Sequence, residues 1–215
     1  MISEEQKYLK EGQSLIKTAF DFEDYILRRS FGLYYIGWAV AFFLYTIPGL
    51  DYPLFTRYNW ILPLFYISSS LVIMLFTGYV FSRAARVSRF LKWFRPGRSL
   101  TAFILFFAYI SIIVSLLAFF GFYSYFILLY IFLGIYVPWA IFNTMWKSGT
   151  RIHIETWVAV VTFVVACAIS IAGIQAGLYY ILTIAWIVVA SMWFVCGVVG
   201  LYDSRYKSMM INDDE

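Results

Sequence analysis

The chain has 215 residues, of which 63% are hydrophobic and only 13% are charged, and its formal net charge is +4. An ordinary soluble domain carries about twice that charged fraction. A soluble globule of this size would expose more surface than so few polar side chains can cover, so the composition excludes one. The excess apolar surface must face lipid, and we expect a multi-pass protein of the cell membrane.

The first segment, residues 1 to 30, is predicted to form an N-terminal amphipathic helix. Ser3 followed by Gln6 is a capping-box pattern, and a helix break is possible at Gly12. Apolar residues recur at helical spacing on one side, namely Tyr8, Leu15, Ala19, Phe22 and Ile26. Two placements fit this pattern equally well: a helix along the inner leaflet or under the bundle, and a solvated helix leading into the first span.

The next segment, residues 31 to 202, is predicted to be an all-α domain of six transmembrane helices. Stretches free of ionisable Asp, Glu, Lys, Arg and His cover 30 to 82, apart from Asp51 and Arg57, then 100 to 146 and 156 to 202. Each block has the length of two crossings and a turn, which predicts three helical hairpins. The expected spans are 31 to 49, 59 to 82, 101 to 120, 124 to 146, 156 to 174 and 178 to 201.

Helix-breaking residues support the predicted reversals. Pro48, Gly49 and Pro53 divide the first block, and Gly173, Gln175 and Gly177 mark the turn of the third. Gly121 and Ser124 give the second block a weaker signal. Three outer turns therefore join the members of the three hairpins.

Basic residues predict the orientation of these helices. Every Lys and Arg except Arg57 falls in the two tails or in the loops 83 to 99 and 147 to 155. Short loops rich in Lys and Arg stay on the cytoplasmic side of a membrane. We therefore expect both termini, including the tail from 203 to 215, and both loops to be cytoplasmic.

The loop from 83 to 99 is the strongest electrostatic feature of the sequence, because it contains six basic residues and no acidic one. Anionic lipid headgroups are the simplest partner of such a collar. A second interpretation is a docking helix for a cytoplasmic protein, whereas nucleic-acid binding is not expected beside a membrane. The residues assigned to this lipid or partner contact are Arg83, Arg86, Arg89, Lys92, Trp93, Arg95 and Arg98.

The predicted spans contain no ionisable Asp, Glu, Lys, Arg or His, which disfavours a proton-driven pump and a voltage sensor. His153 is predicted to be a solvated loop histidine, and Cys167 and Cys196 are predicted to be small apolar residues within helices. The predicted spans also lack the paired histidines, carboxylate pairs and nucleophile dyads that haem binding, metal binding and catalysis need. We expect no enzymatic activity, no cofactor and no metal site.

Neutral polar residues and proline are the remaining candidates for a pathway through the membrane. Ser68, Ser69 and Ser70 lie in the second predicted span, and a kink or break is expected in the fourth span between Gly134 and Pro138. Such serines more commonly hydrogen-bond between helices, and proline is common in membrane helices. A hydrophilic pathway and simple helix packing therefore both fit.

The predicted layout resembles that of membrane subunits of ATP-driven transporters. The shared features are a leading amphipathic helix, six spans, inside termini and a basic segment after the second span, although here only Gly173 to Gly177 joins the last two spans. The leading hypothesis is a permease-like subunit for a neutral or amphiphilic solute, working as a homo-oligomer or with partner chains, among them a cytoplasmic ATPase. The alternative is a non-transporting scaffold or accessory subunit of a larger membrane complex.

Overall fold

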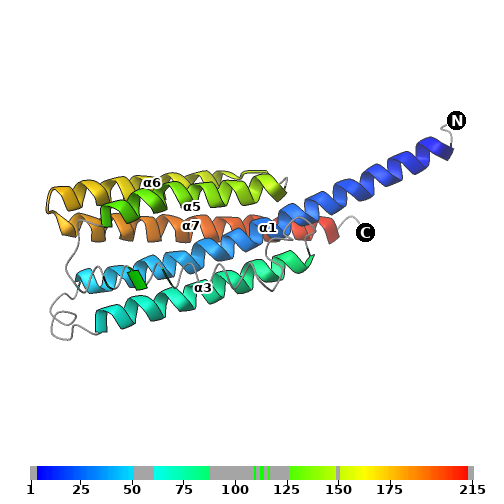
Figure 1. The fold of residues 1–215 in the computed structure, drawn as a ribbon. Helices are drawn as coiled ribbons and strands as arrows, with labels where there is room; N and C mark the ends of the chain where they lie inside the picture. The colour runs from blue at the N-terminus through cyan, green and yellow to red at the C-terminus, as the bar shows by residue number, and fades with distance from the viewer. Residues whose placement is uncertain are drawn as a thin grey trace.

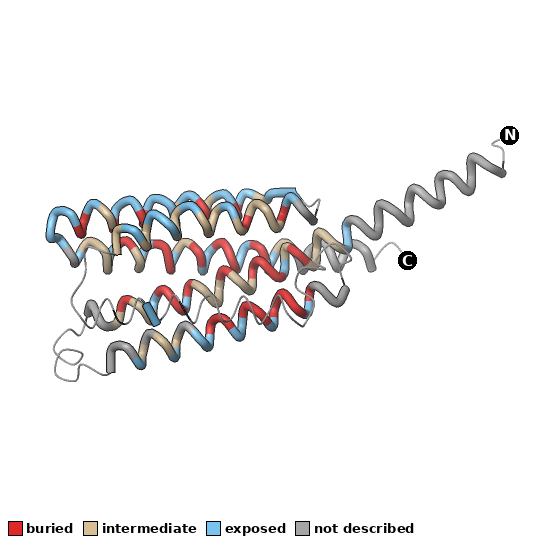
Figure 2. Tube along the Cα trace, in the orientation of Figure 1, coloured by how far each residue is buried: buried red, intermediate tan, exposed pale blue. Residues whose placement is uncertain are grey.

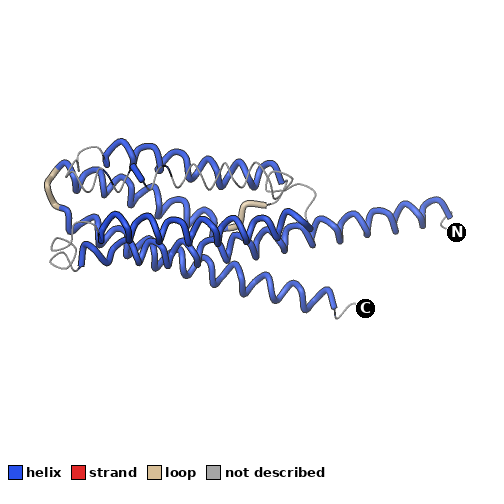
Figure 3. Tube along the Cα trace, turned by 60° about the horizontal axis from the view of Figure 1, so that its bottom comes forward, coloured by secondary structure: helices blue, strands red, loops and turns tan. Residues whose placement is uncertain are grey.

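The protein folds as a bundle of long α-helices (Figure 1). The computed structural model describes residues 4–50, 61–87, 109, 112–113, 116, 126–148 and 151–212. In these residues it has helices and short loops but no strand (Figure 3). The helices are α1 (Glu4–Leu50), α3 (Ile61–Val87), α5 (Phe126–Ser148), α6 (Ile154–Gln175) and α7 (Tyr179–Asn212).

All five helices contain a stretch long and apolar enough to cross a membrane. A membrane-spanning helix satisfies its backbone hydrogen bonds internally, which explains why these apolar stretches become helices and not open sheet. The all-α prediction is confirmed for the described residues, and a multi-pass membrane protein follows. The predicted third span, 101 to 120, lies mostly outside those residues, so the six-span arrangement stays a prediction.

The structure has one continuous helix where the sequence predicts a separate N-terminal amphipathic helix and a first span. α1 runs without interruption from Glu4 to Leu50, so the break considered at Gly12 is not present. Its first turns extend beyond the other helices, away from the bundle (Figure 1). The candidate span within it covers Asp21–Ile47 and so begins ten residues before the predicted position 31.

The helix ends gather at two opposite ends of the bundle (Figure 1). α3 and α5 end where α6 begins and where α1 projects; we call this the charged end. α1 and α6 end, and α5 and α7 begin, at the other end, which we call the turn end. The described parts of both predicted tails and of the segments 83 to 99 and 147 to 155 lie at the charged end. The side of the membrane on which this end lies stays a prediction.

The turn between α6 and α7 lies where the sequence predicts it. Gly177 has φ +70, a left-handed conformation that favours glycine. The amide of Gly177 donates to the carbonyl of Ile174, at 3.1 Å, and the amide of Leu178 to that of Gly173, at 2.8 Å. These two bonds form a Schellman motif, which ends α6 and reverses the chain.

Glycines bring α1 and α7 into backbone contact. α1 packs most extensively on α7, α6 packs on α7, α5 on α6, and α3 on α1. A Cβ atom added to Gly197 would lie 2.7 Å from the Gly32 carbonyl oxygen, and one added to Gly200 3.5 Å from the Gly32 Cα. No larger residue fits between the two backbones at Gly197, so this glycine sets the close approach of the two helices.

Aromatic side chains fill the space among α1, α6 and α7. Trp193 is buried at the centre, and its indole N–H donates to the Ala159 carbonyl at 2.8 Å. Its ring lies 5.1 to 5.9 Å, between centroids, from the rings of Tyr34, Tyr35, Phe42 and Phe163. The buried residues follow the inward faces of these helices, and the outward faces are exposed (Figure 2).

Candidate functional site

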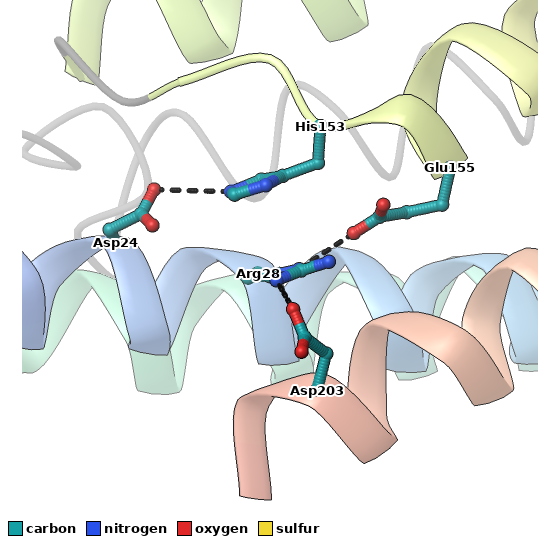
Figure 4. A network of polar contacts seen from close by, with 5 residues as sticks. All are labelled: Asp24, Arg28, His153, Glu155 and Asp203. Carbon is teal, nitrogen blue, oxygen red and sulfur yellow. Dashed lines mark hydrogen bonds and ion pairs between the residues drawn. The ribbon is translucent and has the colours of Figure 1, made fainter. Parts of the chain in front are cut away.

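Five ionisable side chains meet at the charged end, and we call them the charged cluster: Asp24, Arg28, His153, Glu155 and Asp203 (Figure 4). The Arg28 Nε donates to Glu155 Oε1 at 2.7 Å, and its Nη1 donates to Asp203 Oδ2. The Nε2 of His153 lies 3.4 Å from Asp24 Oδ1. One arginine therefore joins α1 to both α6 and α7, and the histidine makes a second link to α1.

The Arg28–Glu155 pair is the most buried pair of the cluster, so its free energy depends most on both charges being present. The side chains of Arg28 and Glu155 are only 11% and 6% exposed, whereas that of Asp203 is 43% exposed. Removing charges from water is unfavourable, and the attraction between partners compensates only while both are present. Asp203 keeps much of its hydration, so its pairing with Arg28 contributes less to stability.

Helix geometry explains how the cluster assembles. Asp24 and Arg28 are four residues apart on α1 and lie on the same side of the helix, one turn apart. His153 is the N-cap of α6, and Glu155 stands in its first turn, where a carboxylate interacts favourably with the helix dipole. Asp203 comes three residues after Gly200, whose closeness to the α1 backbone brings this part of α7 next to Arg28.

A small cavity lies beneath the cluster. Its lining includes Arg28, Tyr35, Met145, Glu155 and Thr156. The centre of a water molecule has ≈ 10 Å³ in which to move there, which is about the room that one water needs.

The residues predicted for lipid or partner contact are only partly described. Arg83 and Arg86 belong to α3, because this helix continues to Val87, and the Arg83 side chain is exposed near the charged end. Arg89, Lys92, Trp93, Arg95 and Arg98 lie outside the described residues. The structure therefore neither joins these seven residues into one surface nor separates them.

The serines predicted for a pathway hydrogen-bond to their own helix. Ser68 and Ser69 both donate to the Phe65 carbonyl, at 3.1 and 2.6 Å. The side chain of Ser70 lies outside the described set.

α5 passes through Gly134 and Pro138 without interruption, so the helix does not end there. The kink predicted at these two residues stays a prediction. A Cβ atom added to Gly134 would lie 3.5 Å from the Cys167 Cβ of α6, which is ordinary packing distance. Gly134 therefore contributes to the contact between α5 and α6.

The interpretation of His153 as a solvated loop histidine is wrong. Its side chain is mostly buried and lies against Asp24 of α1. Arg28 and Asp203 were not predicted as site residues, because Arg28 falls in the N-terminal amphipathic segment and Asp203 in the C-terminal tail, far apart in the sequence. A signal was available: Asp24, Arg28, Phe31 and Tyr35 recur at helical spacing, so the face that is buried at Phe31 and Tyr35 continues through the two charges.

Comparison with known proteins identifies no relative. No family model matches the chain, and no curated protein or solved structure is significantly similar to it. Among the described residues, no three His, Cys, Asp or Glu side chains are grouped so that they could hold a metal ion. The charged cluster joins three helices by contacts between ionisable side chains, of which the Arg28–Glu155 pair is buried.

Proposed function

We propose that this protein is a non-transporting accessory or scaffold subunit of a larger membrane complex. The observation that carries the proposal is the packed aromatic centre of the bundle, where Trp193 contacts rings from both α1 and α6. A carrier needs polar groups that converge on a cavity wide enough for its solute. Between α1, α6 and α7 that space is occupied by tryptophan, tyrosine and phenylalanine.

Hydroxyl groups at membrane depth add support. Thr46, Thr144 and Ser191 donate to carbonyls three or four residues earlier in their own helices. Thr162 donates to the Val158 and Ala159 carbonyls in the same way. Hydroxyls satisfied within a helix contribute little to a hydrophilic path across the bundle.

The outer face of α5 is the surface that we assign to the partner. Of the candidate spans, the one in α5 has the smallest buried share. Its exposed large side chains recur along one side of the helix, at Leu128, Ile131, Ile135 and Trp139. Such a stripe fits against a helix of a partner subunit, which would cover by protein packing what lipid otherwise covers. In this proposal the charged end faces the cytoplasm, and the basic residues of 83 to 98 contact anionic headgroups.

A permease-like subunit is the second candidate, and the charged cluster is the observation that favours it. Ion pairs that tie three helices at one end of a bundle are contacts that a transport cycle could break and remake. The small size of the cavity beneath them makes this candidate the weaker one.

Photocrosslinking in native membranes tests the proposal. A photoreactive amino acid at Ile135 of α5 should give a discrete protein adduct that saturates at a fixed fraction of the chain. Val72 of α3, which is exposed to a similar extent, is the matched control and should give only lipid adducts. Lipid adducts alone at Ile135, or equal protein adducts at both positions, would contradict the proposal, as would saturable solute uptake by the purified chain in liposomes.

A further inference from the structure

Only one of the two carboxylate oxygens of Glu155 accepts a hydrogen bond from a described residue. Its Oε1 accepts the hydrogen bond from Arg28, whereas its Oε2 is buried and has no partner among the described residues. A buried carboxylate oxygen without a hydrogen bond is strongly unfavourable. A hydrogen-bond donor small enough to fit the cavity would satisfy this oxygen.

Tyr35 presents a second buried polar atom to the same cavity. Its hydroxyl lies beside the Thr156 side chain but makes no hydrogen bond of normal geometry with any described residue. A tyrosine hydroxyl both donates and accepts, whereas a carboxylate oxygen only accepts. A molecule that accepts from Tyr35 and donates to Glu155 would satisfy both groups.

We infer that the cavity beneath the charged cluster is a binding site for one water molecule, held between Glu155 Oε2 and the Tyr35 hydroxyl. The available space, ≈ 10 Å³ for the centre of a water, suits a single molecule. The water donates one hydrogen to Glu155 Oε2 and accepts the hydrogen of the Tyr35 hydroxyl. Tyr35 is seven residues beyond Arg28 on α1, about 10 Å along the helix axis between Cα atoms, so this water joins the cluster to a residue two turns further along α1.

Oxidation of Met145 provides a measurement of the bound water. It lines the cavity and is 3% exposed, whereas Met74 is 2% exposed and packs between α1 and α3, outside the cavity lining. X-ray pulses convert a bound water into hydroxyl radical, which oxidises an adjacent methionine even when bulk solvent cannot reach it. In the full chain reconstituted in nanodiscs, Met145 should be oxidised several-fold faster than Met74.

Two variants separate the bound water from general leakage of solvent. Tyr35→Phe keeps the ring contact with Trp193 but removes one of the two hydrogen-bonding groups, and it should lower Met145 oxidation to the rate of Met74. Tyr34→Phe, at the neighbouring position outside the cavity lining, should leave the Met145 rate unchanged. Equal oxidation of Met145 and Met74 in the native chain, or a Met145 rate that Tyr35→Phe does not lower, would overturn the inference.

Discussion

Arg28 is the residue on which the charged end depends most. Arg28→Met leaves Glu155 buried without its partner, and breaking such a pair typically lowers the free energy of unfolding by about 3–5 kcal/mol. We expect a loss of that size for the purified protein, measured by unfolding in mixed detergent and SDS micelles. Asp203→Asn should cost at most about 1 kcal/mol, because that carboxylate is partly hydrated.

Arg29→Met is the matched control for this prediction, since Arg29 is exposed and its Nη1 donates to the Tyr25 hydroxyl at 3.3 Å, outside the charged cluster. It should change stability by no more than about 0.5 kcal/mol. The double variant Arg28→Met with Glu155→Met should recover much of the loss, because it removes both buried charges together. Equal losses for Arg28→Met and Arg29→Met would show that the buried pair has no special weight.

At the scale of helix pairs, Gly197 determines how closely α7 approaches α1. Gly197→Ala places a methyl group 2.7 Å from the Gly32 carbonyl oxygen and 3.0 Å from the Ile36 backbone nitrogen, and backbone atoms cannot swing aside as side chains can. Overpacking of this kind costs about 1–3 kcal/mol, which exceeds the gain of about 0.5–1 kcal/mol from replacing a helical glycine by alanine. We expect a net loss of stability in the same unfolding assay.

Gly134→Ala is the comparison, because its new methyl group meets Cys167 at 3.5 Å, an ordinary contact. There the helix-forming preference of alanine has no opposing clash, so stability should stay the same or rise by up to about 1 kcal/mol. A larger loss at Gly134 than at Gly197 would contradict the assignment of the close contact to α1 and α7.

The same helix pairs show what the sequence could and could not predict. The reversal at Gly177 was predictable because it depends on local signals, namely Gly173, Gln175 and Gly177 in the middle of a long uncharged block. The contact of Gly32 with Gly197 was not, since the two residues are far apart in the chain and hydropathy says nothing about which helices meet. Arg28 was missed for the same reason: its partners, Glu155 and Asp203, lie on helices that only the folded bundle brings together.

At the scale of the whole molecule, the two ends of α6 provide a direct measure of membrane orientation. Ile152 precedes this helix at the charged end and Ala176 follows it at the turn end, and both are exposed. If the basic residues set the orientation, Ile152→Cys should react with a membrane-impermeant maleimide only in inside-out vesicles, and Ala176→Cys only in right-side-out vesicles. The native cysteines, Cys167 and Cys196, are buried, so the unmodified chain should not label and is the control. Labelling of both variants from one side would show that α6 does not cross the bilayer, and the reversed pattern would place the charged cluster outside the cell.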